Sequence, residues 1–190
     1  MTFLPRIKVS ILAVGSLDNI IARQAVDNID WSSLEDKKFL KEFLDQCDLC
    51  IMGRKSYELS KSFMEKRNCV IFTRNLPPIR DSAVSEQSAP ILSYVNPEFV
   101  ELDSWLAKNF SFPKKTVAIL GGPDIYRYFI SRGWVDDIYL TIEPLIFGKG
   151  LSWISSGDKH LDTELRLISA NQLNPKGTIL LHYCVKNSRN

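Results

Sequence analysis

The stretch Thr116-Val-Ala-Ile-Leu-Gly-Gly-Pro-Asp124 contains a whole strand-to-helix junction. Its apolar first half, rich in β-branched residues, predicts a buried strand. Pro123 suits the first turn of a helix, where no amide donor is needed, so we expect a helix over residues 123–130. Gly121 and Gly122 let the backbone approach a ligand closely. The free amides and the helix dipole predict an anion site, although a tight turn without a ligand explains the same residues.

A second junction of this kind lies at Met52-Gly-Arg-Lys-Ser-Tyr57. Arg54, Lys55 and Ser56 fall at the N-terminus of a predicted helix, where the dipole disfavours cations unless an anion lies between them. Thr73-Arg-Asn75 follows the next strand and adds a further cation. Two phosphate-type sites at neighbouring strand ends favour a dinucleotide over a mononucleotide. Neither site has the G-x-G-x-x-G spacing, and a solvated surface cluster is the alternative.

Strands and helices alternate along the rest of the chain. Strands are expected at residues 7–14, 49–52, 69–72, 116–120 and 138–142, helices at 34–47, 97–107 and 123–130 with a short one after Gly53, and loops at 15–30 and 76–90. Residues 166–170 and 178–185 flank a turn and predict an antiparallel hairpin. The sequence therefore predicts one α/β domain over residues 1–190, with a mostly parallel sheet, an antiparallel edge and helices on both faces.

Asp36 is the candidate acid. On its predicted helix it shares a stripe with Leu40, Phe43 and Cys47, so it faces the core near the first turn. Burial there raises a carboxyl pKa, whereas the helix dipole lowers it. Such a group could anchor a cationic or amidine-like ring and relay a proton. Alternatively, Asp36 serves only the helix start, in a capping box with a preceding serine.

Composition argues against several other classes of protein. The chain has 190 residues, and 24 basic against 22 acidic residues give a net charge of +2. It lacks the run of like charges that a dedicated nucleic-acid binder usually carries. No apolar stretch is long enough for a membrane span, and residues 1–8 lack a secretory core. The C-x-x-C of Cys47 and Cys50 has no second pair, so we expect no metal, plain buried thiols and a reducing cytoplasm.

Six segments, taken together and in order, resemble the dihydrofolate reductase-like superfamily. They are S-L-D-N-I-I-A at 16–22, W-S-S-L-E-D at 31–36, I-M-G-R-K-S-Y-E at 51–58, V-I-F-T-R-N at 70–75, I-L-G-G-P-D-I-Y at 119–126 and D-I-Y-L-T at 137–141. The resemblance covers nearly the whole chain and implies a three-layer α/β/α fold. Within the superfamily, E-P-L-I-F-G-K-G-L at 143–151 is similar to the riboflavin-biosynthesis pyrimidine reductases. Asp30 and Glu35 stand where dihydrofolate reductases usually have proline.

The resemblance implies that NADPH binds with its phosphates on the glycine turns. Arg54 and Arg74 would hold a 2′-phosphate in guanidinium forks, which favours NADPH over NADH. Small side chains would border the nicotinamide. The implied cofactor-binding residues are Val14, Ala22, Gly53, Arg54, Lys55, Ser56, Thr73, Arg74, Gly121, Gly122, Pro123, Asp124 and Ile125.

The resemblance also implies an NADPH-dependent oxidoreductase that transfers hydride to 5-amino-6-(phosphoribosylamino)uracil or a near relative. The implied catalytic residues are Asp36 and Thr141, and the implied substrate-binding residues are Trp31, Leu40, Arg67 and Tyr126. The basic residues that could hold the substrate phosphate are Arg23, Lys38 and Arg67.

Two alternatives stay open. One is a dihydrofolate reductase, in which Asp36 anchors a pterin and Arg67 holds a glutamate tail. The other is a reductase-like nucleotide-binding protein with another substrate. Because riboflavin-type relatives commonly pair, we expect a homodimer, with Trp153 and Ile154 either at the contact or in the core.

Overall fold

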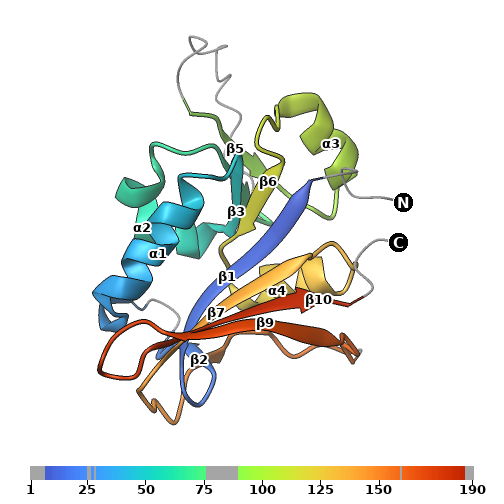
Figure 1. The fold of residues 1–190 in the computed structure, drawn as a ribbon. Coiled ribbons are helices and arrows are strands. Elements are labelled where there is room, and N and C mark those ends of the chain that lie inside the picture. The colour runs from blue at the N-terminus through green and yellow to red at the C-terminus, as the bar shows by residue number, and fades with distance from the viewer. Residues whose placement is uncertain (1–6, 25–26, 28, 76–89, 159, 187–190) are drawn as a thin grey trace.

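A computed structural model describes residues 7–24, 27, 29–75, 90–158 and 160–186. An eight-stranded sheet in the order β5-β4-β3-β6-β1-β7-β10-β9 forms the centre of this part of the chain (Figure 1). The strands are β1 (Lys8–Ser16), β3 (Leu49–Gly53), β4 (Cys69–Phe72), β5 (Leu92–Val95), β6 (Thr116–Ile119), β7 (Asp137–Glu143), β9 (Leu165–Gln172) and β10 (Ile179–Val185). The strands from β5 to β7 run parallel, and β10 and β9 add an antiparallel edge. The predicted α/β class and C-terminal hairpin are confirmed.

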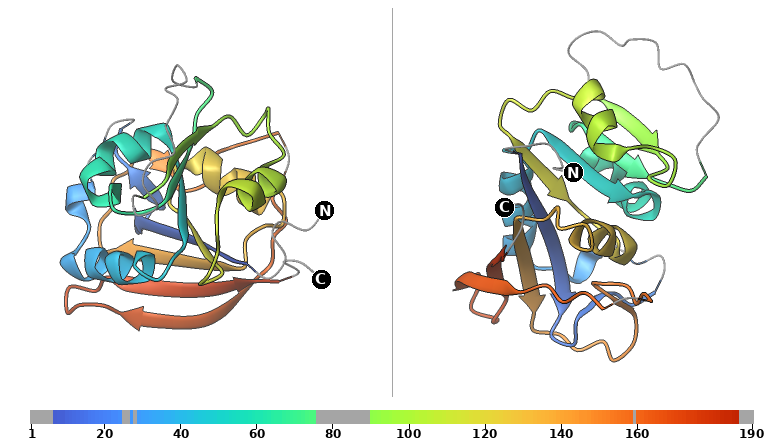
Figure 2. Two further views of the ribbon diagram at one scale, coloured as in Figure 1. Left: turned by 90° about the horizontal axis from the view of Figure 1, so that it is seen from above. Right: turned by 90° about the vertical axis from the view of Figure 1, so that its right-hand side faces the viewer.

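Helices cover both faces of the sheet (Figure 2). On one face, α1 (Leu34–Leu44) and α2 (Arg54–Met64) bury a core with Leu12 and Met52. On the other, α3 (Leu102–Asn109) and α4 (Pro123–Ile130) pack over Val9 and Ile11. Because both faces of β1 are covered, Ile11 and Leu12 are buried on opposite faces of the sheet, which explains the hydrophobic run of residues 11–14.

Several predicted boundaries were wrong. The helix expected from Pro97 begins at Leu102, because residues 96–99 form a turn in which the Asn96 side chain accepts from the Glu98 amide at 3.0 Å. Phe99, which falls within the predicted helix, precedes the observed one and is 81% exposed. The first helix ends at Leu44 rather than residue 47. The predicted loop at 76–90 lies outside the described residues except for Pro90.

The predicted loop at 15–30 contains a strand and a helical turn. Its strand β2 (Ile20–Ala22) pairs with β8 (Leu151–Ser152), and η1 (Ile29–Trp31) follows. The pairing partner lies far along the chain, so local periodicity gave no sign of it. This small second sheet stands beside the carboxyl ends of the parallel strands, where open α/β sheets bind ligands.

Candidate active site

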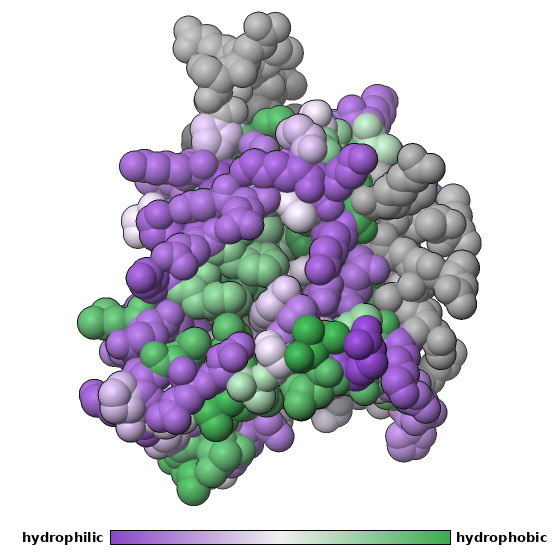
Figure 3. All heavy atoms as spheres, in the orientation of Figure 1, coloured by the Kyte–Doolittle hydropathy of each residue, from purple (hydrophilic) through white to green (hydrophobic). Residues whose placement is uncertain are grey.

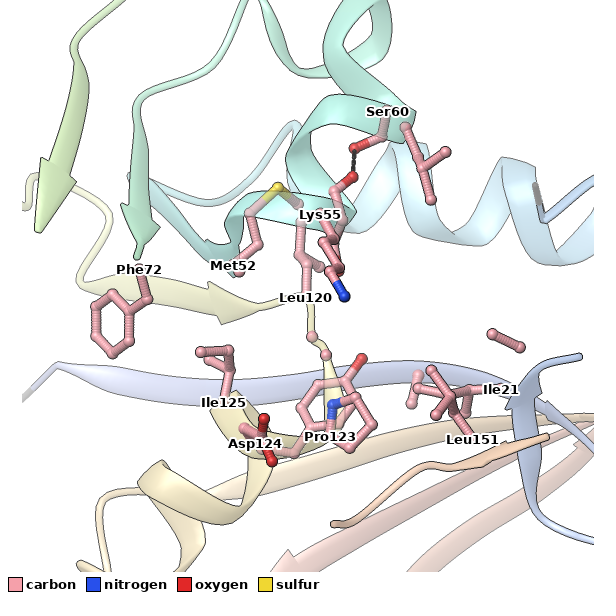
Figure 4. A pocket seen from close by; sticks show the side chains of 18 of the residues that line it. Ile21, Met52, Lys55, Ser60, Phe72, Leu120, Pro123, Asp124, Ile125 and Leu151 are labelled. Carbon is pink, nitrogen blue, oxygen red and sulfur yellow. Dashed lines mark hydrogen bonds between the residues drawn. The ribbon is translucent and has the colours of Figure 1, made fainter. Parts of the chain in front are cut away.

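One large cleft of about 1280 Å³ runs along the carboxyl ends of β1, β3, β4, β6 and β7 (Figure 4). Its volume exceeds the roughly 300–1,000 Å³ typical of a site for one small ligand, so a dinucleotide and a substrate can lie side by side. The predicted site residues that line it are Val14, Ala22, Asp36, Leu40, Gly53, Arg54, Lys55, Ser56, Thr73, Arg74, Gly121, Gly122, Pro123, Asp124, Ile125, Tyr126 and Thr141.

The two glycine turns meet in this cleft. The Gly53 amide donates a hydrogen bond to the Gly121 carbonyl at 2.6 Å, and the Gly121–Gly122 peptide bond is cis. Gly121 has φ +104°, a conformation that side chains disfavour, and a Cβ there would lie 3.0 Å from the Tyr126 hydroxyl. The glycine is therefore required by both backbone conformation and space.

The N-termini of two helices open into the cleft. The N-cap residue is Gly53 in α2 and Gly122 in α4, and in neither helix does a side chain accept a hydrogen bond from the first turn. The first amides of α2 are thus available to an anion, whereas in α4 this holds for the Asp124 amide, because Pro123 has no N–H and the Ile125 amide donates to the Gly122 carbonyl. Figure 4 shows Lys55 reaching between these helices from one side while Asp124 lies on the other. The arrangement fits the phosphates of a dinucleotide.

Basic side chains lie beside these helix ends. Lys55 and Arg74 are exposed. The Arg54 guanidinium pairs with Glu58 one turn along α2, at 2.7 Å. Since that pair is more than half exposed, an incoming phosphate can compete for the guanidinium.

Asp36 and Thr141 close the opposite end. The Asp36 side chain is 6% exposed, and Thr141 is 1% exposed. Burial raises the pKa of the Asp36 carboxyl to about 6, with the nearby Glu143 carboxylate adding to the rise, while the hydroxyls of Thr141 and Ser32 oppose it. The backbone amide of Asp36 donates to the Ser33 hydroxyl at 3.3 Å, which caps α1. The Asp36 carboxyl does not complete a capping box, because the Ser33 amide donates to the Glu143 carboxylate at 2.7 Å instead.

Three predicted substrate residues are engaged elsewhere. Trp31 is not among the residues that line the cleft, and its ring stands edge-on to Phe147 at 5.1 Å. Arg67 is also outside the lining, because its guanidinium pairs with Asp45 and lies over the ring of Phe63. Tyr126 lines the cleft, but its buried hydroxyl donates to the Leu12 carbonyl at 2.7 Å.

Tyr126 thus packs against Gly121 of the glycine turn, and burial raises the pKa of its hydroxyl.

Trp153 and Ile154 were predicted to lie either at a dimer contact or in the core. Both are half-buried and pack against the core.

Two further walls of the cleft are formed by residues that were not among the predicted site residues. Ile21 of β2 and Leu151 of β8 form one of them and point toward the cleft (Figure 4). Phe39 and Tyr139 line the end of the cleft that holds Asp36, with ring centroids 5.8 Å apart. Phe39 lies one helical turn before Phe43, a member of the predicted apolar stripe, so its inward direction was detectable. Tyr139 reaches the site only through its pairing with Leu12 in the sheet.

The described residues hold no group of three or more histidine, cysteine, aspartate or glutamate side chains that could bind a metal ion. Their helices are too short or too polar to cross a membrane. None of the four cysteines forms a disulfide bond, and Cys50 and Cys69 are buried.

The fold and the cleft define a dihydrofolate reductase-like α/β protein of the type found in riboflavin-pathway reductases. The chain belongs to the RibD C-terminal domain family, which matches residues 8–179. Two uncharacterized proteins of Bacillus subtilis are related: YyaP is 25% identical over 64% of this chain and 67% of its own length, and YwjB is 24% identical over 88% and 92%.

Solved structures share the fold at low identity. A putative riboflavin biosynthesis protein from Shewanella sp. PV-4 is 16% identical with a TM-score of 0.68, covering 95% of this chain and 99% of that one. A pyrimidine reductase-like protein from Corynebacterium diphtheriae is 17% identical with a TM-score of 0.71, covering 97% and 93%. RibD from Acinetobacter baumannii is 14% identical with a TM-score of 0.74, and the match spans 96% of this chain but 59% of that chain.

Proposed function

We propose that the protein is an NADPH-dependent reductase of a pyrimidine-type heterocycle, acting as the reductases of riboflavin biosynthesis do. One observation carries the proposal. Two glycine-capped helix N-termini, fit for phosphates, open into the same cleft as the buried pair Asp36 and Thr141. A site for a dinucleotide thus adjoins a site for a proton donor, which is what reduction of a C=N bond requires.

Several groups that line the cleft would contact the cofactor. The amides at the starts of α2 and α4 would hold its phosphates, with Lys55 between them. Arg54 and Arg74 would hold the 2′-phosphate. NADPH held by these residues would supply the hydride for reduction of a C=N bond of the substrate, and the nitrogen of that bond would take up one proton.

Asp36 is the group placed to deliver that proton. Its carboxyl is shielded from water, and a pKa of about 6 keeps a protonated fraction available near neutral pH. The Thr141 hydroxyl orients the carboxyl, while Phe39 and Leu40 would pack against a flat ring and exclude water.

Purified protein titrated with NADPH, and then with methotrexate, tests this function. NADPH binding without methotrexate binding, together with NADPH oxidation in the presence of 5-amino-6-(phosphoribosylamino)uracil or its dephosphorylated nucleoside, is the expected result. Failure to bind NADPH at millimolar concentration would contradict it.

Dihydrofolate reduction is the second candidate, because a buried acid beside a threonine can also anchor a pterin ring. Methotrexate binding to the NADPH complex, lost in Asp36→Asn, would favour that function. The engagement of Arg67 with Asp45 weighs against it, since no guanidinium at that position is left to hold a glutamate tail.

A further inference from the structure

We propose that Glu143 is a positioning residue for Asp36. Its buried carboxylate holds the helix start that carries Asp36, and it places a second negative charge beside that acid. Glu143 is not among the described residues that line the cleft, so it acts through Asp36 and not on a ligand. The inference rests on the proposed function, because the proton transfer assigned to Asp36 belongs to that proposal.

The carboxylate of Glu143 is buried at the end of β7. The residue is 4% exposed, and one oxygen accepts from the Ser33 amide at 2.7 Å while the other accepts from the Thr178 hydroxyl at 2.6 Å. The Thr178 oxygen in turn accepts from the Asn174 side chain at 2.9 Å, which leaves the hydroxyl proton for Glu143. Both oxygens of Glu143 therefore accept, as those of an ionised carboxylate do.

The negative charge of Glu143 is not cancelled by a direct partner. Its two hydrogen-bond donors, the Ser33 amide and the Thr178 hydroxyl, are neutral. No ion pair between described residues includes Glu143. Its charge is thus left to act on the groups around it.

Glu143 is connected to Asp36 from two sides. On the helix side, the Ser33 amide bonds Glu143, and the Ser33 hydroxyl accepts from the Asp36 amide at 3.3 Å. On the sheet side, Thr141, whose hydroxyl bonds the Asp36 carboxyl, lies two residues before Glu143 and so points to the same face of β7. Glu143 therefore helps to fix Asp36 relative to Thr141.

The β9–β10 turn braces this arrangement. The Asn174 side chain in the turn donates to the Thr178 hydroxyl and also to the Glu35 carboxylate at 3.1 Å, in the first turn of α1. Figure 1 shows the hairpin turn beside the start of this helix. The strand end, the helix start and the hairpin are thus joined around Glu143, which limits the movement of its carboxylate.

The charge of Glu143 acts on the protonation of Asp36. Burial is the main cause that raises the pKa of the Asp36 carboxyl, the Glu143 carboxylate raises it further, and the Lys37 ammonium opposes both. Because both carboxyl groups are buried, little water screens one from the other. Glu143 thereby keeps Asp36 protonated to a higher pH than burial alone would.

The other carboxylates near Asp36 have cations beside them. Asp27 lines the cleft, but its oxygens accept from the Arg23 side chain at 3.0 and 2.8 Å. Glu35 is exposed, and the nearby Lys176 lowers its pKa, after the larger effect of the bond from Asn174. Glu143 is therefore the carboxylate whose removal should change Asp36 most.

The pH at which Asp36 titrates tests the proposal directly. Carbon-13 NMR of protein labelled at the side-chain carboxyl carbons measures it, and Asp36→Asn identifies the Asp36 resonance. Glu143→Gln keeps the side-chain shape and an acceptor for the Ser33 amide but removes the charge. We expect the midpoint of the Asp36 titration to fall by about 0.5–1 pH unit. An unchanged or higher midpoint overturns the inference.

Glu35→Gln is the matched control. It removes a carboxylate from the residue next to Asp36, but Glu35 is exposed, so solvent and salt screen its charge. We expect the Asp36 midpoint to stay within about 0.2 pH unit of the native value. An equal fall in both variants would show a general effect of net charge and would overturn the specific role of Glu143.

The native protein provides a measurement that does not depend on the folding of a Glu143 variant. When two carboxyl groups are coupled, protonation of one is felt by the other. The Glu143 carboxyl resonance should therefore show a step at the Asp36 midpoint, and this step should be absent from Asp36→Asn. A Glu143 resonance without the step overturns the inference.

Turnover separates this inference from the proposed function. With active protein, Glu143→Gln should lower the rate of NADPH oxidation about three- to tenfold at pH 7 and less at pH 5, because a smaller fraction of Asp36 stays protonated at pH 7. An equal loss at both pH values would indicate a structural role alone and overturn the inference. Native protein that binds NADPH but oxidises none with the pyrimidine contradicts the proposed function, whereas a lower Asp36 midpoint in Glu143→Gln still supports the link between the two carboxyl groups.

Discussion

At the residue scale, the backbone and the side chain of Asp36 act separately. The amide donates to the Ser33 hydroxyl that caps α1, and the carboxyl is buried at the end of the cleft next to Thr141 and Glu143. Keeping a charged carboxylate there costs stability, because burial and the second carboxylate both oppose ionisation. Such a cost is commonly tolerated where the group has a chemical task.

Because ionisation of Asp36 is unfavourable in the folded protein, we expect the free energy of unfolding to depend on pH. The Asp36 carboxyl has a pKa of about 6 in the folded protein against 3.8 for the unperturbed group, so its contribution is most favourable below pH 4 and is lost as the pH rises to 6. At about 1.4 kcal/mol per pKa unit, about 2–3 kcal/mol of the free energy of unfolding is lost. Asp36→Asn should abolish this loss, as measured by urea unfolding between pH 4 and 8. An unchanged pH profile would contradict the prediction.

The same substitution should affect catalysis. Since reduction consumes a proton, we expect the rate of the native protein to fall above about pH 6, where Asp36 ionises. Asp36→Asn should lower kcat by about 100-fold or more and remove this ionisation from the pH–rate profile. The partly exposed Asp103, in the first turn of α3 and outside the cleft lining, provides the control variant Asp103→Asn, which should leave the profile intact.

Arg74 is predicted to select NADPH over NADH. Removing its guanidinium in Arg74→Ala should weaken NADPH binding by about tenfold or more, because a charge-assisted bond to the 2′-phosphate is lost, and leave NADH binding unchanged. Fluorescence titration with both cofactors measures the difference. Lys108→Ala on α3, outside the cleft lining, is the control. An equal loss for both cofactors would show that Arg74 does not contact the 2′-phosphate.

At the scale of elements, the cleft depends on two strand-to-helix junctions that hold each other. The Gly53 amide of one bonds the Gly121 carbonyl of the other. Tyr126, one turn into α4, anchors the second junction to β1 through Leu12. The N-termini of α2 and α4 are therefore held in fixed relation, as binding of one dinucleotide requires.

Gly121→Ala tests this arrangement. The left-handed backbone of Gly121 and the nearby Tyr126 hydroxyl both oppose a methyl group, so we expect a loss of about 1–3 kcal/mol of stability and about tenfold weaker NADPH binding. Gly177→Ala in the β9–β10 turn is the matched control. It has φ +97° with nothing within 4 Å, so it should be destabilised by strain but bind NADPH normally. Comparable weakening of NADPH binding in both variants would contradict a local role for Gly121.

At the scale of the whole molecule, the sheet places its two ends in different surroundings. The parallel strands are enclosed between helices, whereas β9 is an edge strand among the described residues, and seven of its eight residues are exposed. Leu165, Leu167 and Ile168 are 38%, 51% and 44% exposed. Hydrophobic side chains also appear on the lower front of the surface, where the hairpin lies (Figure 3). An unprotected edge of this kind favours pairing with another strand.

We propose that the expected homodimer forms through β9, with the strands of two copies side by side. Leu167→Lys should then convert the dimer to a monomer, because a buried charge opposes association. Sedimentation equilibrium measures the change. Phe99→Lys, at a residue that is 81% exposed near the other end of the sheet, should remain dimeric. A native protein that sediments as a monomer would contradict the proposal.

The sequence by itself determined the α/β class, most parallel strands, the hairpin and both glycine turns. These follow from signals that lie within a few residues, namely apolar periodicity, glycine and proline. The inward direction of Asp36 also followed from helical spacing alone. The proximity of the Glu143 carboxylate did not, because Glu143 lies in a distant strand.

Only the tertiary structure decided how side chains are shared between site and scaffold. Arg67 pairs with Asp45, 22 residues away, and Tyr126 bonds Leu12, 114 residues away. The wall formed by β2 and β8 likewise joins two segments far apart in the chain. Whether a basic side chain faces the cleft depends on which partner lies beside it in the folded chain. That partner is distant in the sequence, so residue type and local spacing do not predict it.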